Sequence, residues 1–537
     1  MRILFFGRRF TYFRNFDSVL RELASRGHVI HLAVERETDE GRPLVEGLVA
    51  EYPNISVGVA PGRTPDDWSW VASRLRHGLE YLRYQHKLFD DTPKLRDRSR
   101  ERTPGVFVAL ADAVGRYARW SRRPVEAVLR WLERSTLDDP TLRAFVEEQR
   151  PDVVLITPLV SLGSSQIDYL RAARSLGIPT ALCVWSWDHL SSKALIRDLP
   201  DRVFVWNDTQ KHEAMHLHRV PAERIVVTGA QCFDKWFDRA PSRDRERFCR
   251  QIGLPSNRPI LLYVCSAPFI GSPPEAPFVV DWIRRIRTNG SAELRDTPIL
   301  VRPHPSRRPE WEGIDLTPFA EVVVWGSDPV SPDARNDYFD SLFHSAVVVG
   351  LNTSAFIEAG ILGRPVHTIL LPEWYESQMG TVHFRYLFEA GGGLLTSATS
   401  FDEHLKQLNE VLAHPATGVR PFVRAFVRPR GLDVAATPVF VEHVETMNGL
   451  AVAPLAQPRF TGLARWMLNK GLSWRQDVSR EHLVYSEREL ESIVRLRNNR
   501  ESKIARERER KRREQEHKAL KAANKEQRRA LKEQRQR

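Results

Sequence analysis

One segment, Gly350 to Pro365 with the sequence GLNTSAFIEAGILGRP, combines residue types that bind a phosphorylated ligand. A strand is expected to end at Gly350, and Asn352, Thr353 and Ser354 then lead into a helix. Free N–H groups and the positive end of the helix dipole at such a turn attract an anion. Glu358 falls about one turn into the helix, where its carboxylate could accept hydrogen bonds from vicinal hydroxyls such as those of a ribose. The alternative is that the polar residues cap the helix and Glu358 is an exposed glutamate.

A second candidate is the sequence Arg302-Pro303-His304-Pro305, which directly follows a predicted strand. A guanidinium and an imidazole in that position could bind a diphosphate or stabilise charge on a leaving phosphate. The alternative is that Arg302 pairs with a structural carboxylate and that His304 is a turn residue. Ser266 is a third polar residue at the end of a predicted strand.

Charged residues also follow predicted strands in the first part of the chain. Arg8 and Arg9 come after the first strand, and two arginines there favour an anionic partner such as a phosphate-bearing acceptor. Asp188 and His189, in the sequence WSWDHLSSK that ends at Lys193, could take a proton from an acceptor hydroxyl. The alternative for Arg8 and Arg9 is that they are simply exposed to solvent. The alternative for the second segment is a capped loop whose tryptophans pack in the hinge between the domains.

The elements that must position these residues are short β-branched runs that alternate with helical patterns. This alternation predicts an α/β fold with two doubly wound, Rossmann-like domains, whose ligands bind in a cleft at the carboxyl ends of parallel strands. The first series of expected strands is Arg2 to Phe6, Val29 to Val34, Ile55 to Val59, Val153 to Thr157 and Thr180 to Trp185. The second series is Val203 to Trp206, Ile225 to Thr228, Ile260 to Cys265, Ile299 to Arg302, Val322 to Trp325, Ala346 to Gly350 and Val366 to Ile369.

The domain boundaries follow from changes in these patterns. Residues 1–198 are predicted to form the first domain, with a helical insertion at about 66–148. Residues 199–450 are predicted to form the second domain, with a helix near Pro438 to Met447 that could cross back to the first. Residues 451–483 are interpreted as a linker, and residues 484–537 as a basic, charged tail that is helical or disordered.

Composition restricts the function classes. The chain has 80 Lys and Arg against 68 Asp and Glu, but residues 486–537 alone hold 19 basic and 10 acidic side chains. The remainder is nearly neutral, so the folded part is not expected to bind nucleic acid. Four dispersed cysteines indicate neither a disulfide framework nor a zinc site, and they favour a reducing cytoplasm.

Any membrane contact is expected to be peripheral, because no apolar stretch is long enough to span a bilayer. The insertion mixes aromatic and basic residues, which would suit a helix lying on an anionic membrane, although a helix packed on the first domain is the alternative. These residues are Trp68, Trp70, Arg74, Arg76, Tyr81, Arg83, Tyr84 and Lys87. The basic tail could touch lipids, nucleic acid or an acidic partner, or be a solvated extension.

Together, Ser266, the Arg-Pro-His-Pro loop and the NTSAFIEAGILGRP segment resemble the donor half of a GT-B glycosyltransferase. The resemblance covers roughly residues 1–450 and is closest to enzymes of bacterial surface-polysaccharide assembly and to CDP-glycerol glycerophosphotransferases. It implies that His304 contacts the donor phosphates, that Thr353 and Ser354 bind phosphate, and that Glu358 holds the ribose. UDP-N-acetylglucosamine 2-epimerases share a related fold and a similar histidine.

The resemblance implies a glycosyltransferase that moves a sugar from a nucleotide-diphosphate donor to a surface glycan or a lipid-linked acceptor, in the cytoplasm or peripherally on the inner face of the membrane. The second domain would hold the donor through Ser266, Arg302, His304, Asn352, Thr353, Ser354 and Glu358. The first domain would hold the acceptor through Arg8, Arg9 and Lys193, and the catalytic residues would be Asp188, His189 and His304. Neither a cofactor nor a metal is expected, because the donor is itself activated and basic side chains can replace a metal ion.

Three other functions are compatible with the sequence. Two are enzymatic: transfer of glycerol phosphate from CDP-glycerol, and epimerisation of UDP-N-acetylglucosamine without an acceptor. The third is a non-catalytic scaffold that acts through its basic tail.

Overall fold

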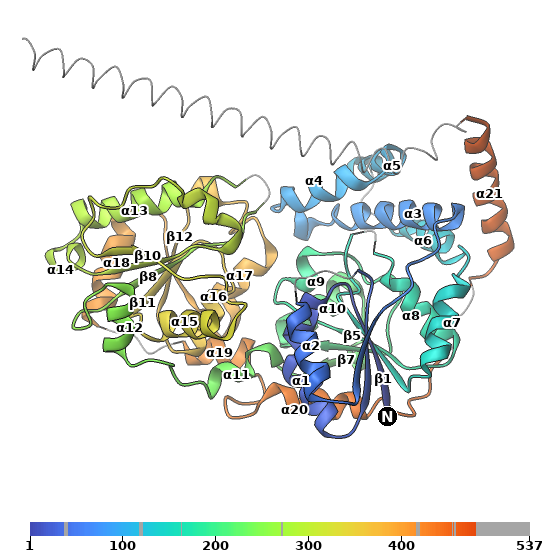
Figure 1. The fold of residues 1–537 in the computed structure, drawn as a ribbon. Coiled ribbons are helices and arrows are strands. Elements are labelled where there is room, and N and C mark those ends of the chain that lie inside the picture. The colour runs from blue at the N-terminus through green and yellow to red at the C-terminus, as the bar shows by residue number, and fades with distance from the viewer. Residues whose placement is uncertain are drawn as a thin grey trace, which may run out of the picture. The chain divides into compact units, whose positions relative to one another are not determined.

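Two parallel sheets flanked by helices form the body of the protein in a computed structural model (Figure 1). The structure describes residues 1–36, 41–117, 122–162, 164–269, 272–414, 419–453, 455 and 458–478. The chain divides into two compact units, Met1–Thr461, which contains both sheets, and Gly462–Arg537. The two sheets confirm the expected α/β fold with two Rossmann-like halves.

The first sheet has seven strands in the order β3-β2-β1-β4-β5-β6-β7, and all its pairings are parallel. Its central strands are buried over almost their whole length, because helices cover both faces of the sheet. The strands are β1 (Arg2–Gly7), β2 (Val29–Val34), β3 (Ile55–Val59), β4 (Val153–Thr157), β5 (Thr180–Cys183), β6 (Arg202–Val205) and β7 (Ile225–Val227).

The helices of the first half include the predicted insertion between β3 and β4. The described residues between 67 and 149 contain no strand, and Asp66 caps the first helix by accepting a hydrogen bond from Ser69 N–H. The α-helices are α1 (Asp17–Ser25), α2 (Arg42–Glu51), α3 (Asp67–Arg83), α4 (Pro93–Arg102), α5 (Gly105–Tyr117), α6 (Arg122–Arg134), α7 (Pro140–Gln149), α8 (Gln166–Ser175), α9 (His189–Ser192) and α10 (Asp208–His218). The 3-10 helices are η1 (Phe10–Phe16), η2 (Lys87–Phe89), η4 (Ala222–Arg224) and η5 (Gln231–Phe233).

The second sheet has six parallel strands in the order β10-β9-β8-β11-β12-β13. The strands are β8 (Leu261–Val264), β9 (Ile299–Arg302), β10 (Val322–Val324), β11 (Val347–Gly350), β12 (Val366–Ile369) and β13 (Leu395–Ala398). The sequence did not predict β13, because its residues, LTSA, include only one β-branched side chain.

The helices of the second half again cover both sheet faces. They are α11 (Asp234–Phe237), α12 (Arg245–Ile252), α13 (Glu275–Asn289), α14 (Ala292–Arg295), α15 (Pro332–Phe343), α16 (Ala355–Ile361), α17 (Val382–Glu389), α18 (Phe401–Ala413), α19 (Arg420–Phe426) and α20 (Ala436–Glu445), with 3-10 helices η6 (Pro305–Trp311), η7 (Pro372–Trp374) and η8 (Ala390–Gly392). The last described helix, α21 (Thr461–Val478), runs across the boundary between the compact units.

The predicted boundary between the two halves, at residues 198 and 199, is wrong. Strands β6 and β7 extend the first sheet, with Leu182 beside Val203 and Phe204 beside Val226. The chain therefore leaves the first sheet only after Val227. Strand periodicity gave no indication of this, because a strand at the end of one sheet has the same pattern as a strand that starts another.

Helix α20 returns the chain to the first half. Phe440, Val441 and Val444 are buried in the same cluster as the residues of β1, β2 and α1. At the start of α20, the Thr437 hydroxyl lies 2.8 Å from that of Ser18 in α1. The two halves are thus joined by two chain crossings, one after β7 and one before α20.

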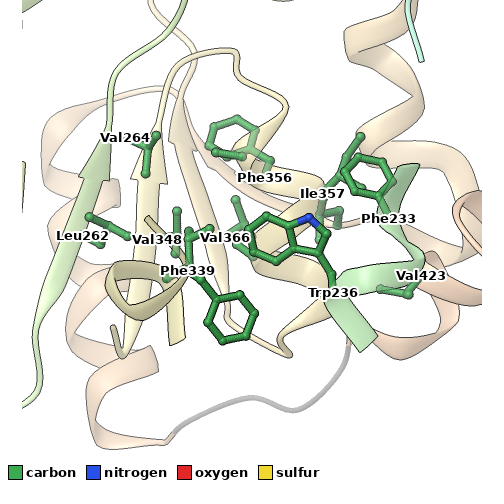
Figure 2. Packing of buried hydrophobic residues seen from close by; sticks show 14 of the residues in the cluster. Phe233, Trp236, Leu262, Val264, Phe339, Val348, Phe356, Ile357, Val366 and Val423 are labelled. Atoms are coloured by element: carbon green, nitrogen blue, oxygen red, sulfur yellow. The ribbon is translucent and has the colours of Figure 1, made fainter. Parts of the chain in front are cut away.

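The core on one face of the second sheet positions helices α11 and α16 (Figure 2). Trp236 of α11 packs edge-on against Tyr338 and lies 5.4 Å from the ring of Phe339. Phe356 and Ile357 of α16 belong to the same buried cluster. This packing brings Lys235, which precedes Trp236, close to Glu358, which follows Ile357.

The structure changes two further expectations. The predicted linker at residues 451–483 contains the whole of helix α21. The predicted tail at 484–537 lies outside the described residues. The idea that the insertion lies on a membrane through its mixed aromatic and basic residues is wrong for the members that are buried in the protein, Arg76, Tyr81, Arg83 and Tyr84. Among the described helices, none combines the length and the apolar character needed to cross a membrane.

Candidate functional site

Three of the predicted residues follow neighbouring strands at the carboxyl edge of the second sheet. Ser266 comes after β8, His304 after β9 and Asn352 after β11, and β8 lies between the other two strands. Gly350 allows these strand ends to approach closely, because a Cβ atom there would lie 2.7 Å from the carbonyl oxygen of Val264. Ser266, His304, Asn352, Thr353, Ser354 and Glu358 are called the second-sheet cluster below.

Ser266 connects two loops of this cluster. Its hydroxyl accepts a hydrogen bond of 3.0 Å from the backbone N–H of Asn352. Its own N–H donates to the buried carboxylate of Glu275 at 2.8 Å, and its carbonyl oxygen accepts from Arg307 Nε at 2.9 Å. Arg307 in turn forms an ion pair of 2.7 Å with Glu310. Ser266 therefore holds the loop after β11 in place.

His304 has one ring nitrogen engaged by its own loop. The backbone N–H of Ser306 donates to Nδ1 at 3.2 Å, so the neutral ring carries its proton on Nε2. Burial, and then the charge of Arg307, lower the pKa of His304. No hydrogen bond to Nε2 is found among the described residues. His304 can thus donate a hydrogen bond from Nε2 to a ligand at physiological pH.

The turn between β11 and α16 offers further donors. The Thr353 hydroxyl accepts from Ala355 N–H at 3.3 Å, and the side-chain amide of Asn352 donates to the carbonyl oxygen of Ser377. Within the described residues, the backbone N–H groups of Thr353 and Ser354 have no protein acceptor. These two N–H groups are available to the oxygens of an anion.

Glu358 is surrounded by groups from distant parts of the chain. Tyr338 in α15 donates its hydroxyl hydrogen to the Glu358 carboxylate. Burial raises the pKa of Glu358 to about 7, although this hydrogen bond and the charges of Lys235 and Arg14 lower it. A carboxylate with two cations close by suits a ligand that offers hydroxyls and negative charge together.

Arg302 does not have the role that its position predicted. Its guanidinium is buried and donates to Ser341 Oγ at 3.0 Å and to the carbonyl oxygens of Asp337 and Ser327 at 3.3 Å each. The ring of Tyr338 lies 5.3 Å away, and burial lowers the pKa of Arg302 to about 10. Arg302 therefore supports Tyr338, the partner of Glu358, and is neither a phosphate ligand nor the partner of a structural carboxylate among the described residues.

In the first half, His189 is held by backbone groups on both sides of its ring. Trp185 N–H donates to Nδ1 at 3.3 Å, and Nε2 lies 2.8 Å from the carbonyl oxygen of Pro158. The side chain is 0% exposed, and burial lowers the pKa of His189 to about 3. Its assignment as a catalytic base is wrong, since neither ring nitrogen can reach a substrate proton.

Asp188 and Lys193 neutralise each other. Lys193 Nζ lies 2.8 Å from Asp188 Oδ2, and the Ser186 and Ser192 hydroxyls also donate to this carboxylate. Burial opposes ionisation of Asp188, but the charges of Lys193 and His383, together with the hydrogen bonds from Lys193 and Ser186, outweigh burial and lower the pKa of Asp188. Asp188 is therefore a weak proton acceptor, and Lys193 is engaged in the same loop. The neighbouring Trp187 contacts the ring of His383 in α17 at 4.7 Å, so this loop joins the two halves.

A different carboxyl group at the carboxyl edge of the first sheet suits a proton acceptor better. Glu35 directly follows β2, and Ser165 Oγ lies 3.5 Å from its carboxylate. Burial raises the pKa of Glu35 to about 7, although the charge of Arg8 lowers it. Arg8 Nη1 donates to Ser161 Oγ at 2.7 Å. These four residues are called the first-sheet cluster; Arg9 is exposed and lies outside it.

Some of these residues could have been found from the sequence, and others could not. Glu35 follows a predicted strand in the same way as Arg8, so the signal was present. Lys235, Arg14 and Tyr338 give no such signal, because only folding brings them to Glu358. Among the described residues, no group of three His, Cys, Asp or Glu side chains could hold a metal ion, and independence of metal stays a prediction.

No protein-family model matches the chain, and no curated protein matches its sequence. Among solved structures, a UDP-GlcNAc 2-epimerase from Neisseria meningitidis bound to UDP-GlcNAc shares 12% identity at a TM-score of 0.47, covering 83% of this chain and 100% of that chain. A glycosyltransferase from Rickettsia africae shares 12% identity at a TM-score of 0.47, covering 83% and 98%. WaaG, a glycosyltransferase involved in lipopolysaccharide biosynthesis, shares 12% identity at 0.43, covering 83% and 100%. Similarity at this level does not decide the function of this chain, which has to come from its own residues.

Proposed function

We propose that this protein is a glycosyltransferase that transfers a sugar from a nucleotide-diphosphate donor to a glycan or lipid-linked acceptor. The observation that carries the proposal is the second-sheet cluster. It combines the Nε2 donor of His304 and two backbone N–H groups with a carboxylate, Glu358, that has Lys235 and Arg14 near it. A nucleoside diphosphate presents the matching groups, since its phosphates need donors and its ribose hydroxyls need an acceptor.

The diphosphate would lie against the N–H groups of Thr353 and Ser354, and His304 would donate to it from Nε2. As the bond between the anomeric carbon and the diphosphate oxygen breaks, negative charge develops on that oxygen, and these donors stabilise it. Lys235 and Arg14 add positive charge without a divalent metal. We therefore expect turnover to persist in the presence of EDTA.

On the acceptor side, we propose that Glu35 takes the proton of the attacking hydroxyl, with Arg8 close to it. The acceptor oxygen forms a bond to the anomeric carbon, the diphosphate leaves with the electron pair, and the hydroxyl proton passes to Glu35. A carboxyl group with a pKa of about 7 is well matched to this task at neutral pH. The Asp188 carboxylate is less suitable, because Lys193 lowers its pKa.

The donor site can be tested by thermal shift and calorimetry with UDP, GDP, CDP, their sugar conjugates and CDP-glycerol. One nucleotide class is expected to stabilise the protein, because a ligand that binds only the native state raises its stability. His304→Ala and Glu358→Ala should each weaken that binding by roughly 1 to 3 kcal/mol. His216→Ala, which removes an exposed histidine, is the matched control and should bind normally.

Unchanged affinity in folded His304→Ala and Glu358→Ala variants would contradict the proposed donor site. Product analysis then decides the reaction. Sugar transfer that depends on an acceptor supports the proposal, whereas epimerisation of UDP-N-acetylglucosamine without an acceptor, or turnover of CDP-glycerol alone, would replace it.

A further inference from the structure

Helix α21 has an apolar face that is exposed in the structure. Leu463, Trp466 and Met467 are 52%, 58% and 45% exposed. With the exposed Lys470 they have the spacing i, i+3, i+4 and i+7, which places all four on one side of the helix. The exposed side of α21 thus carries three large apolar side chains and a lysine, while Ala464 and Leu472 of the same helix are buried.

The net charge of the protein lies almost entirely in the same compact unit. Residues 462–537 hold 23 basic and 12 acidic side chains, a net charge of +11, and the whole chain has +12. Residues 1–461 are consequently close to neutral. Almost all of the net positive charge therefore belongs to the unit that contains α21, and very little of it belongs to the unit that contains the two sheets.

We infer that the unit beginning at Gly462 binds anionic lipid membranes, with the exposed face of α21 entering the interface and the basic residues attracted to lipid phosphates. Peripheral attachment generally needs two signals, and this unit has an apolar face and a concentrated positive charge. Tryptophan suits the boundary between water and acyl chains, and the lysine can extend its ammonium group to the headgroups. Nucleic acid would match the charge but offers no apolar phase for Leu463 and Met467.

The inference can be tested with the full-length protein and vesicles of phosphatidylglycerol and phosphatidylcholine in equal parts, separated by flotation. Vesicles of phosphatidylcholine alone should bind roughly tenfold more weakly, and added salt should weaken binding to the anionic vesicles. The double substitution Trp466→Ser and Met467→Ser should weaken binding roughly tenfold, because it removes apolar area without changing charge. Val330→Ser removes a side chain that is 60% exposed in the second half, and it should bind like the unsubstituted protein.

Equal binding of the double variant and the unsubstituted protein would overturn the role of α21, and absence of binding to anionic vesicles would overturn the inference altogether. If single-stranded RNA displaces the protein from vesicles and the double substitution does not change vesicle binding, the basic residues would be a nucleic-acid-binding segment instead. Circular dichroism verifies that the double variant is folded, and Leu463→Ser provides a second test of the same face. Thermal shift with nucleotides on the same samples tests the proposed function independently, because membrane binding by α21 and nucleotide binding by the second-sheet cluster do not depend on each other.

Discussion

At the scale of single residues, Glu358 is proposed to bind the donor, and its buried carboxylate lowers the stability of the folded protein at neutral pH. Its carboxyl is held among buried groups, and burial raises its pKa from 4.5 to about 7. The folded protein therefore binds a proton between pH 4.5 and about 7 that the unfolded chain releases. Stability attributable to this residue falls as the pH rises through that window, and the loss is complete above about pH 7.

Glu358→Gln is expected to stabilise the ligand-free protein above pH 7 and to leave its stability unchanged below pH 4.5. The gain should be about 1 to 3 kcal/mol, because glutamine keeps the acceptor for Tyr338 but has no charge to bury. Nucleotide affinity should fall in the same variant, since an amide is a weaker acceptor for ribose hydroxyls. Denaturant titrations across this pH range provide the measurement, and a variant that is equally destabilised at every pH would refute the assignment.

The sequence identified the strand-end residues better than it identified their roles. His304, Ser266 and Asn352 lie where the strand pattern placed them, because the carboxyl edge of a parallel sheet follows from periodicity alone. The residue types near Trp185 gave no sign that backbone groups hold both ring nitrogens of His189. That information depends on how the chain folds around the ring, and no local pattern contains it.

At the scale of elements, buried ion pairs attach the helical insertion to the first half. Arg76 of α3 donates to Glu133 of α6 at 2.7 Å and to both carboxylate oxygens of Asp168 in α8 at 2.9 and 2.6 Å. Arg171 of α8 completes the link with a bond of 2.6 Å to Glu133. The sequence predicted an insertion of helices but not this network, since its hydrogen bonds join residues that are far apart in the chain, such as Arg76 and Asp168, which are separated by 92 residues.

Arg76→Met should lower the free energy of unfolding by about 3 kcal/mol, because it leaves two buried carboxylates with fewer donors. Arg100→Met is the matched control from the same insertion. Its guanidinium is 58% exposed and lies 3.6 Å from Asp112, so its loss should change stability by about 0.5 kcal/mol or less. Equal stability of the two variants in urea would show that apolar packing alone attaches the insertion.

At the scale of the whole molecule, Asp234 ties together the two chain crossings between the halves. It follows the first crossing, and its carboxylate accepts from Arg428 Nη2 at 3.0 Å, just before the second. At the second crossing, it also accepts from the backbone N–H groups of Ala436 and Thr437 at 3.0 and 2.7 Å. Asp234 therefore links α11 to the segment after α19 and to the start of α20 through one buried side chain.

Asp234→Asn keeps the size of this side chain but replaces one acceptor oxygen with an amide that faces N–H donors, and it removes the charge opposite Arg428. The free energy of unfolding should fall by about 3 kcal/mol, since buried donors lose their acceptor. The two halves should also unfold less cooperatively, so that fluorescence and circular dichroism no longer give the same urea midpoint. Asp281→Asn, at a carboxylate that is 38% exposed and pairs only with Arg284 and Arg285 among described residues, is the matched control. A single transition within about 0.5 kcal/mol of the unsubstituted protein would mean that the apolar face of α20, and not Asp234, holds the halves together.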